Sequence, residues 1–121
     1  MPGRYRNMNE REEVRLRHML DAGREALAFM QGRTSQDLTD DRMFFLAMVK
    51  ELEIIGEAAG PISEETRQEL PEIPWSMVVA MRNRLVHAYE AISHPLVWSA
   101  LSVHLPELIA ALDKVLPPFI E

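Results

Sequence analysis

Apolar residues recur at every third or fourth position along most of this chain. No segment shows the strict alternation of apolar and polar residues that marks a half-buried strand. A repeat of three to four residues places apolar side chains on one face of an α-helix. The 121 residues are enough for one domain with a modest core. The sequence therefore predicts an all-α fold, a bundle of four to five helices in which residues 1–121 form a single domain.

Residues that start and stop helices divide the chain into five predicted segments. Asp40, Ser63 and Ser93 are suited to helix N-termini, and Gly60-Pro61 is suited to end a helix. Pro106 lies inside the last predicted helix and predicts a kink or break there. The predicted helices span about residues 9–30, 40–59, 63–70, 74–88 and 93–115, with a polar connector over 34–40.

The predicted helix 40–59 is apolar over more than one of its faces. A helix of this kind in a small protein is either central or packs against a second subunit, and the second interpretation predicts a dimer. Gly56 marks a point where another helix approaches closely. The neighbouring Glu57 is expected either to pair with an arginine of helix 74–88 or to be solvated.

Composition excludes several classes of function. There is no cysteine, so disulfides and cysteine-ligated zinc are excluded, and the four histidines show no metal-binding spacing. We therefore expect neither a metal nor a cofactor. The net charge of −6 argues against indiscriminate binding of nucleic acid but leaves room for one local basic site. No signal peptide and no segment long enough to span a bilayer are recognised, which predicts a cytoplasmic protein without membrane contact.

Residues 81–89, with the sequence MRNRLVHAY, form such a basic site in an acidic chain, because no acid lies between Trp75 and Tyr89. At about 100° per residue, Arg82 lies at the edge of the apolar stripe of its helix, whereas Asn83 and His87 point away from it. Arginines bind phosphate, and a histidine moves protons near neutral pH. The competing interpretation is two solvated arginines without a task, which are common on helix surfaces.

These residue types suit the cleavage of RNA without a metal. A histidine can take the proton of the 2′-hydroxyl, and an arginine can stabilise charge on the phosphate. One helix supplies only one histidine, so a second acid must come from elsewhere. A symmetric dimer that pairs two such helices across a cleft would supply it.

The spacing of Arg82, His87 and Tyr89 resembles the arginine-x4-histidine-x-tyrosine motif of HEPN-domain proteins. The chain looks most like the HepT-like branch, since segments IGEAA at 55–59, IPW at 73–75 and MRN at 81–83, together with Trp98 and Leu105-Pro106, follow that branch's order. The resemblance covers about residues 40–108.

This resemblance implies a dimeric helical bundle and metal-independent endoribonuclease activity, with Arg82 and His87 as the catalytic pair. Asn83 and Arg84 would support substrate binding. The resemblance also implies a type VII toxin–antitoxin system, in which a nucleotidyltransferase antitoxin adds AMP to Tyr89. Ala88 stands where the branch often has glycine, and residues 90–93 lack the usual aspartate.

Another class of function remains open. A non-catalytic helical module would use the same face to bind a nucleotidyltransferase or a nucleotide, and the acidity of the chain suits it. Which RNA would be cut does not follow from the sequence.

Overall fold

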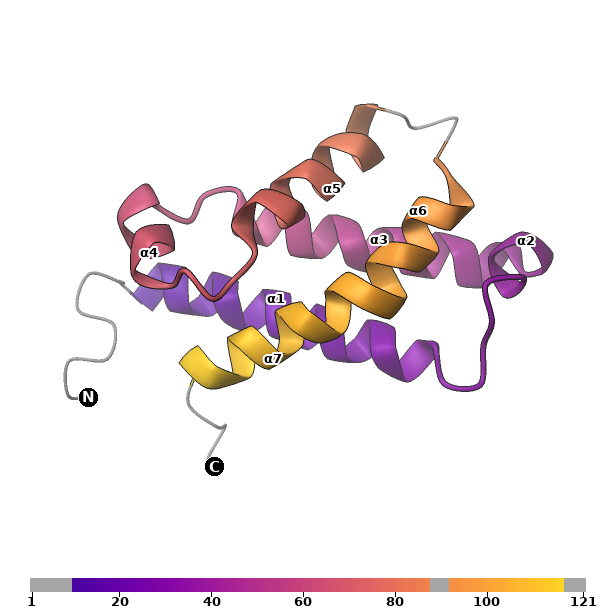
Figure 1. Cartoon of the computed structure of the whole chain (residues 1–121), viewed down its shortest axis with the longest axis horizontal. Coiled ribbons are helices and arrows are strands. Elements are labelled where there is room, and N and C mark those ends of the chain that lie inside the picture. The colour runs from indigo at the N-terminus through magenta and orange to yellow at the C-terminus, as the bar shows by residue number, and fades with distance from the viewer. Residues whose placement is uncertain (1–9, 88–91, 117–121) are drawn as a thin grey trace.

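Two long helices, α1 (Glu10–Phe29) and α3 (Arg42–Ala59), lie side by side and form the centre of the bundle (Figure 1). The structure, a computed structural model, describes residues 10–87 and 92–116, without the side chains of Val86 and His87. This part of the chain contains six helices, if His94–Val115 is counted as one, and no strand. The remaining elements are α2 (Asp37–Asp40), α4 (Glu64–Glu69), α5 (Trp75–His87), and the continuous α6 (His94–Ser99), η2 (Ala100–His104) and α7 (Leu105–Val115).

Most predicted helix ends are confirmed, because short-range contacts determine them. The side chain of Ser63 accepts a hydrogen bond from Thr66 N at 3.1 Å and caps α4, and Ser93 caps α6 in the same way. Helix α1 is followed by Gly32, whose φ of 74° belongs to the left-handed region that favours glycine. The cap of α3 is Asp41 rather than Asp40.

The connector predicted over residues 34–40 contains the one-turn helix α2, which raises the helix number above the four to five expected. Gln36 precedes α2 without making a side-chain cap, and the local support at this end is a hydrogen bond from Thr34 N to Asp37 Oδ2 at 2.8 Å. Leu38 of α2 is buried. Tertiary burial of this leucine therefore accounts for a helix that the polar sequence did not indicate.

The break predicted at Pro106 is wrong, because helix runs continuously through this position. Pro106 is the second residue of α7, and the π-helical turn η2, Ala100–His104, directly precedes α7. Proline cannot donate to the carbonyl four residues earlier. A wider turn immediately before the proline accommodates this loss without ending the helix.

The expectation that no segment could span a membrane also needs correction. By length and composition alone, the continuous helix His94–Val115 qualifies. A core helix passes the same test, and one face of this helix is fully buried at Leu101, Leu108 and Leu112. Its α7 part packs against α1, and an ion pair joins Arg24 to Asp113.

Helix α3 contacts α1 on one side and α5 on another, which confirms the prediction that it is central. Met48, Leu52 and Ile55 of α3 are at most 1% exposed. Met43 and Leu46 of the same helix remain exposed. Dimerisation stays a prediction.

Two buried carboxylates lie along α1 and α3, and they differ in their partners. Glu12 accepts hydrogen bonds from Ser63 N at 2.6 Å and from Thr66 Oγ1 at 2.7 Å, which connects α4 to α1. Glu51 is 4% exposed, and its Oε1 has no hydrogen-bond partner. Burial, and then the nearby Glu25, raise the pKa of Glu51 to about 7.

Candidate functional site

Helix α5 carries the basic segment, and contacts at its first residue fix where it begins. Trp75 Nε1 donates to the carbonyl oxygen of Leu70 at 3.0 Å, and the Arg67 guanidinium lies 5.2 Å from the ring centre of Trp75. Pro74 precedes the first turn, where its missing N–H is not needed. Trp75 is thus a structural anchor for the start of α5.

The stem of Arg82 packs against α3 at Gly56, where no residue larger than glycine fits. A Cβ atom built on Gly56 would lie 2.6 Å from Cβ and 2.8 Å from Cγ of Arg82. These atoms are next to the α5 backbone and cannot swing aside as the end of a long side chain could. Gly56 therefore acts as a positioning residue, which confirms the close helix approach predicted there and identifies Arg82 as its partner.

The Nε atom of Arg82 is buried and has no hydrogen-bond partner among the residues that the structure describes. Leaving a buried donor unpaired costs about 1–3 kcal/mol. Most buried polar groups in proteins are paired, so an unpaired one requires a reason. An acceptor other than the described residues, such as a phosphate or a second protein chain, would satisfy it.

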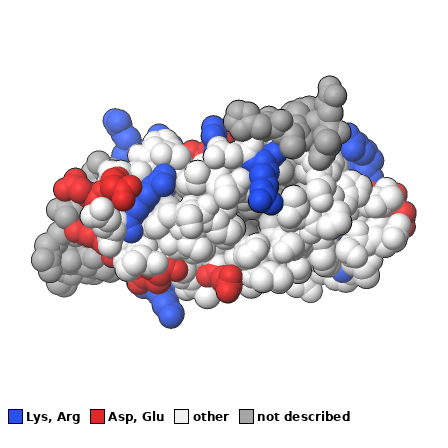
Figure 2. All heavy atoms as spheres, turned by 45° about the horizontal axis from the view of Figure 1, so that its top comes forward, with Lys and Arg blue, Asp and Glu red and all other residues white. Residues whose placement is uncertain are grey.

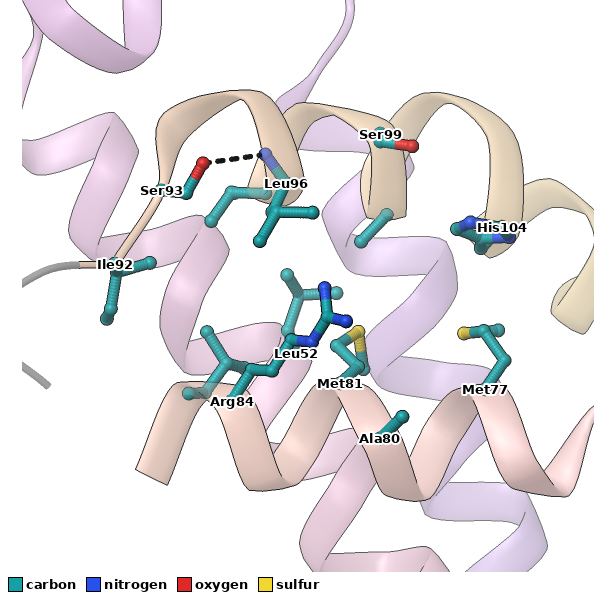
Figure 3. Close-up of a pocket in the computed structure, with 13 residues that line it drawn as sticks. Leu52, Met77, Ala80, Met81, Arg84, Ile92, Ser93, Leu96, Ser99 and His104 are labelled. Carbon is teal, nitrogen blue, oxygen red and sulfur yellow. Dashed lines mark hydrogen bonds between the residues drawn. The ribbon is translucent and has the colours of Figure 1, made fainter. Parts of the chain in front are cut away.

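Arg84 projects from a different side of α5. Its side chain reaches into the space between α5 and α6, which Met77 and Met81 of the same helix also line (Figure 3). Arg84 and Asn83 are exposed. Within residues 10–87 and 92–116, neither Arg82 nor Arg84 forms an ion pair.

Of the predicted partners of Arg82, the structure describes the backbone of His87 and no part of Tyr89. His87 is the last residue of α5, and its side chain lies outside the described atoms, as does all of Tyr89. His87 follows Arg82 by five positions, which corresponds to a rotation of about 140° around the axis of an ideal helix. The structure thus places Arg82 of α5 against α3 but does not show Arg82 and His87 together.

A cavity of about 320 Å³ lies between α5 and the helix formed by α6 and η2. Its walls are mostly aliphatic side chains and methionines, and Arg84, Ser99 and His104 are the main polar residues among them. No sequence pattern predicts this cavity, because its walls come from segments that the fold brings together.

Charge is unevenly distributed around the site. Figure 2 shows acidic side chains gathered toward the end of the molecule that carries α4, whereas the middle of this face is mostly uncharged with separate basic side chains. Glu57 is exposed and forms no ion pair with the described residues, so the expected bridge to an arginine of α5 is absent. No group of three described residues could hold a metal ion.

Comparison with known proteins assigns the family. A family model described as "Ribonuclease HepT-like" matches residues 19–115. A protein named "Probable ribonuclease HepT" from Thermococcus cleftensis is 32% identical over 66% of this chain and 73% of its own length. The chain therefore belongs to the HepT-like ribonuclease family, as its motif and neighbouring segments indicated.

Other relatives carry similar names. A protein from Caldanaerobacter subterraneus that is named "Putative RNase TTE0752" is 29% identical over 84% of this chain and 90% of its own length. A protein of the same description from Methanocaldococcus jannaschii is 29% identical over 74% of this chain and 83% of its own length. No solved structure matches the chain.

Proposed function

We propose that this protein is a HepT-like toxin, a metal-independent endoribonuclease that acts in the cytoplasm as a homodimer. Arg82 and His87 form its catalytic pair, with Asn83 and Arg84 supporting the substrate. The observation that carries the proposal is the state of Arg82. In a chain of this ribonuclease family, the motif arginine is held against Gly56 with a buried donor that lacks an acceptor.

In the proposed reaction, His87 takes the proton of a ribose 2′-hydroxyl, and the oxygen forms a bond with the adjacent phosphorus. The bond from phosphorus to the 5′-oxygen breaks, and a second acid supplies the proton that the leaving 5′-hydroxyl needs. Arg82 stabilises the charge that develops on the phosphate. Because the arginine stem is fixed, little reorganisation is required when that charge forms.

A homodimer is supported by the geometry of α5. On an ideal helix, positions 82 and 87 lie about 140° apart, so one copy of the helix is not expected to direct both groups at one phosphate. Two antiparallel copies of α5 related by a twofold axis can bring the arginine of one helix to the histidine of the other. The second histidine is then available as the acid for the leaving group.

Regulation by a nucleotidyltransferase antitoxin of a type VII system forms part of the proposal. Addition of AMP to Tyr89 would place a phosphate close in sequence to Arg82 and Arg84. That phosphate would compete with RNA for the same cations. The alternative is a binding module without catalysis, in which Tyr89 is only a substrate of the transferase.

Induced expression of the wild type and of His87→Ala tests the function directly. Growth arrest with new RNA fragments, both lost in the variant, is the expected result. Folded wild-type protein that neither arrests growth nor cuts RNA, but forms a stable complex with a nucleotidyltransferase, would replace the ribonuclease with the binding module.

A further inference from the structure

The cavity between α5 and α6 has the properties of a ligand site rather than of a packing defect. Its volume of about 320 Å³ falls within the range of small-molecule sites. Leu52 and Val97 contribute to an apolar interior, and Ser99 and His104 bring polar atoms to the wall that α6 and η2 provide (Figure 3). Apolar walls with a few polar groups are typical of such sites.

The π-helical turn η2 forms part of this wall. Its first and last residues, Ala100 and His104, both line the cavity, and Ser99 directly precedes it. Inside the turn, Ser102 Oγ donates to the carbonyl oxygen of Trp98 at 2.7 Å. Single π turns within α-helices occur frequently at functional sites. The irregular segment of this helix therefore lies where a ligand would be contacted.

Arg84, which the proposed function assigns to substrate binding, adds a cation to the cavity. Its side chain extends from α5 toward α6 across the space that the other residues enclose (Figure 3). It is exposed and has no ion pair among the described residues. A ligand that satisfies both parts of the site has an apolar body and carries an anionic group next to it.

We propose that the cavity receives one nucleobase of an RNA strand, while Arg84 binds a phosphate of the same strand. The inference rests on the proposed ribonuclease function, because the strand would lie along the helix that carries Arg82. Proteins read RNA mainly through unstacked bases that enter pockets and form hydrogen bonds at their edges. Met77 and Met81 offer sulfur contacts to an aromatic face, and Ser99 and His104 offer edge partners.

Two variants separate the contributions of base and phosphate. Ala80 is exposed and lines the cavity, so Ala80→Phe fills it from the rim with little effect on the core. Arg84→Gln removes the cation and keeps a side chain of similar reach. Matched controls are Ala110→Phe and Arg11→Gln, at exposed positions of α7 and α1 away from the cavity.

The first measurement is calorimetric titration of each protein with the four ribonucleoside 3′-monophosphates. We expect the wild type and both controls to bind with a preference among bases. Ala80→Phe should weaken binding of the preferred nucleotide at least tenfold. Arg84→Gln should weaken binding of all four nucleotides to a similar extent. Absence of any base-dependent binding, or equal binding by wild type and Ala80→Phe, overturns the proposal.

The second measurement is cleavage of a pool of short RNAs, with sedimentation to determine the assembly state. Ala80→Phe should reduce the base preference of cleavage, whereas Ala110→Phe should preserve it.

Cleavage by wild type without nucleotide binding at the cavity refutes the base pocket and leaves the ribonuclease intact. Nucleotide binding that depends on Ala80, without cleavage of any RNA, refutes the ribonuclease and supports the base pocket. A changed assembly state in Ala80→Phe with unchanged nucleotide binding would identify the cavity as a protein contact and refute the proposal.

Discussion

Helix α3 packs against both α1 and α5, and these two interfaces are built differently. The interface with α1 has an apolar core, and the buried carboxylate of Glu51 lies along it near Glu25. Toward α5, the backbone of α3 is bare at Gly56 and the stem of Arg82 occupies the space. Beyond Arg82, α5 separates from α6 and leaves the cavity that Arg84 enters.

We infer that residues at the α1 interface stabilise the fold, whereas residues at the α5 interface position the candidate site. Changes at the α1 interface should alter the free energy of unfolding and leave the activity of the folded protein unchanged. Changes at the α5 interface should alter activity by more than stability accounts for. The following predictions test this division.

Arg82→Lys should produce the largest loss, about 100-fold in kcat/KM for RNA cleavage. Lysine keeps the charge and the aliphatic stem that packs at Gly56, but it cannot form two parallel hydrogen bonds with a phosphate. Steady-state cleavage of a short RNA measures the effect. Arg11→Lys, at an exposed position of α1, should remain within twofold of wild type. An equally active Arg82→Lys would mean that Arg82 is structural.

Gly56→Ala should reduce kcat about tenfold and lower the free energy of unfolding by about 1–3 kcal/mol. The added methyl group would lie 2.6 Å from Cβ of Arg82, so α5 must shift away from α3. Kinetics at a temperature where the variant is fully folded separate the two effects. Gly60→Ala is the matched control, because the nearest atoms to its new Cβ are 3.7 Å away. Full activity of folded Gly56→Ala would contradict the positioning role.

Glu51→Gln should change how stability depends on pH. The pKa of Glu51 is raised to about 7 from an unfolded value of 4.5, so folding favours its neutral form. Its stabilising contribution is complete below pH 4.5 and is lost as pH rises through about 7. Relative to wild type, the glutamine variant should therefore gain about 1–3 kcal/mol between pH 4.5 and pH 8.

Urea unfolding of both proteins across that pH range measures the gain. Glu57→Gln, exposed on the same helix, should follow the wild-type profile. Parallel profiles for wild type and Glu51→Gln would show that Glu51 titrates normally. RNA cleavage by the two folded proteins should be equal.

Glu12→Gln should have the smallest effect, a loss of about 1 kcal/mol in the free energy of unfolding. The amide can still accept one hydrogen bond, but the charge-assisted bonds from Ser63 N and Thr66 Oγ1 cannot both be kept. Thermal unfolding measures the loss, and Glu10→Gln at the exposed start of α1 is the control. A loss of cleavage in folded Glu12→Gln would contradict the division between the two interfaces.

Local signals explain which parts of the fold followed from sequence. Ser63 and Ser93 were predicted as caps because the hydrogen bonds that they accept come from residues three positions later. Helix α2 was missed, since burial of Leu38 by distant residues stabilises it. Of the kink or break predicted at Pro106, the break was wrong, because the neighbouring π-helical turn can absorb the lost hydrogen bond.

The candidate site also combines features that the sequence predicts with features that it does not. The position of Arg82 at the edge of the apolar stripe followed from the helical repeat, and Gly56 indicated a close approach. That these two residues meet depends on how α5 crosses α3, which the sequence alone does not specify. The cavity depends on the separation of α5 from α6, which is set by contacts from several segments.

The unpaired Nε of Arg82 has a thermodynamic consequence. The free chain carries the desolvation cost of that donor, and any species that supplies an acceptor removes it. Binding and folding are then linked, so a phosphate or partner chain that reaches Arg82 stabilises the folded protein beyond the affinity of its other contacts. The protein is thus expected to resist unfolding best when a phosphate or a partner chain is bound at Arg82. It is expected to be most easily degraded when neither is bound.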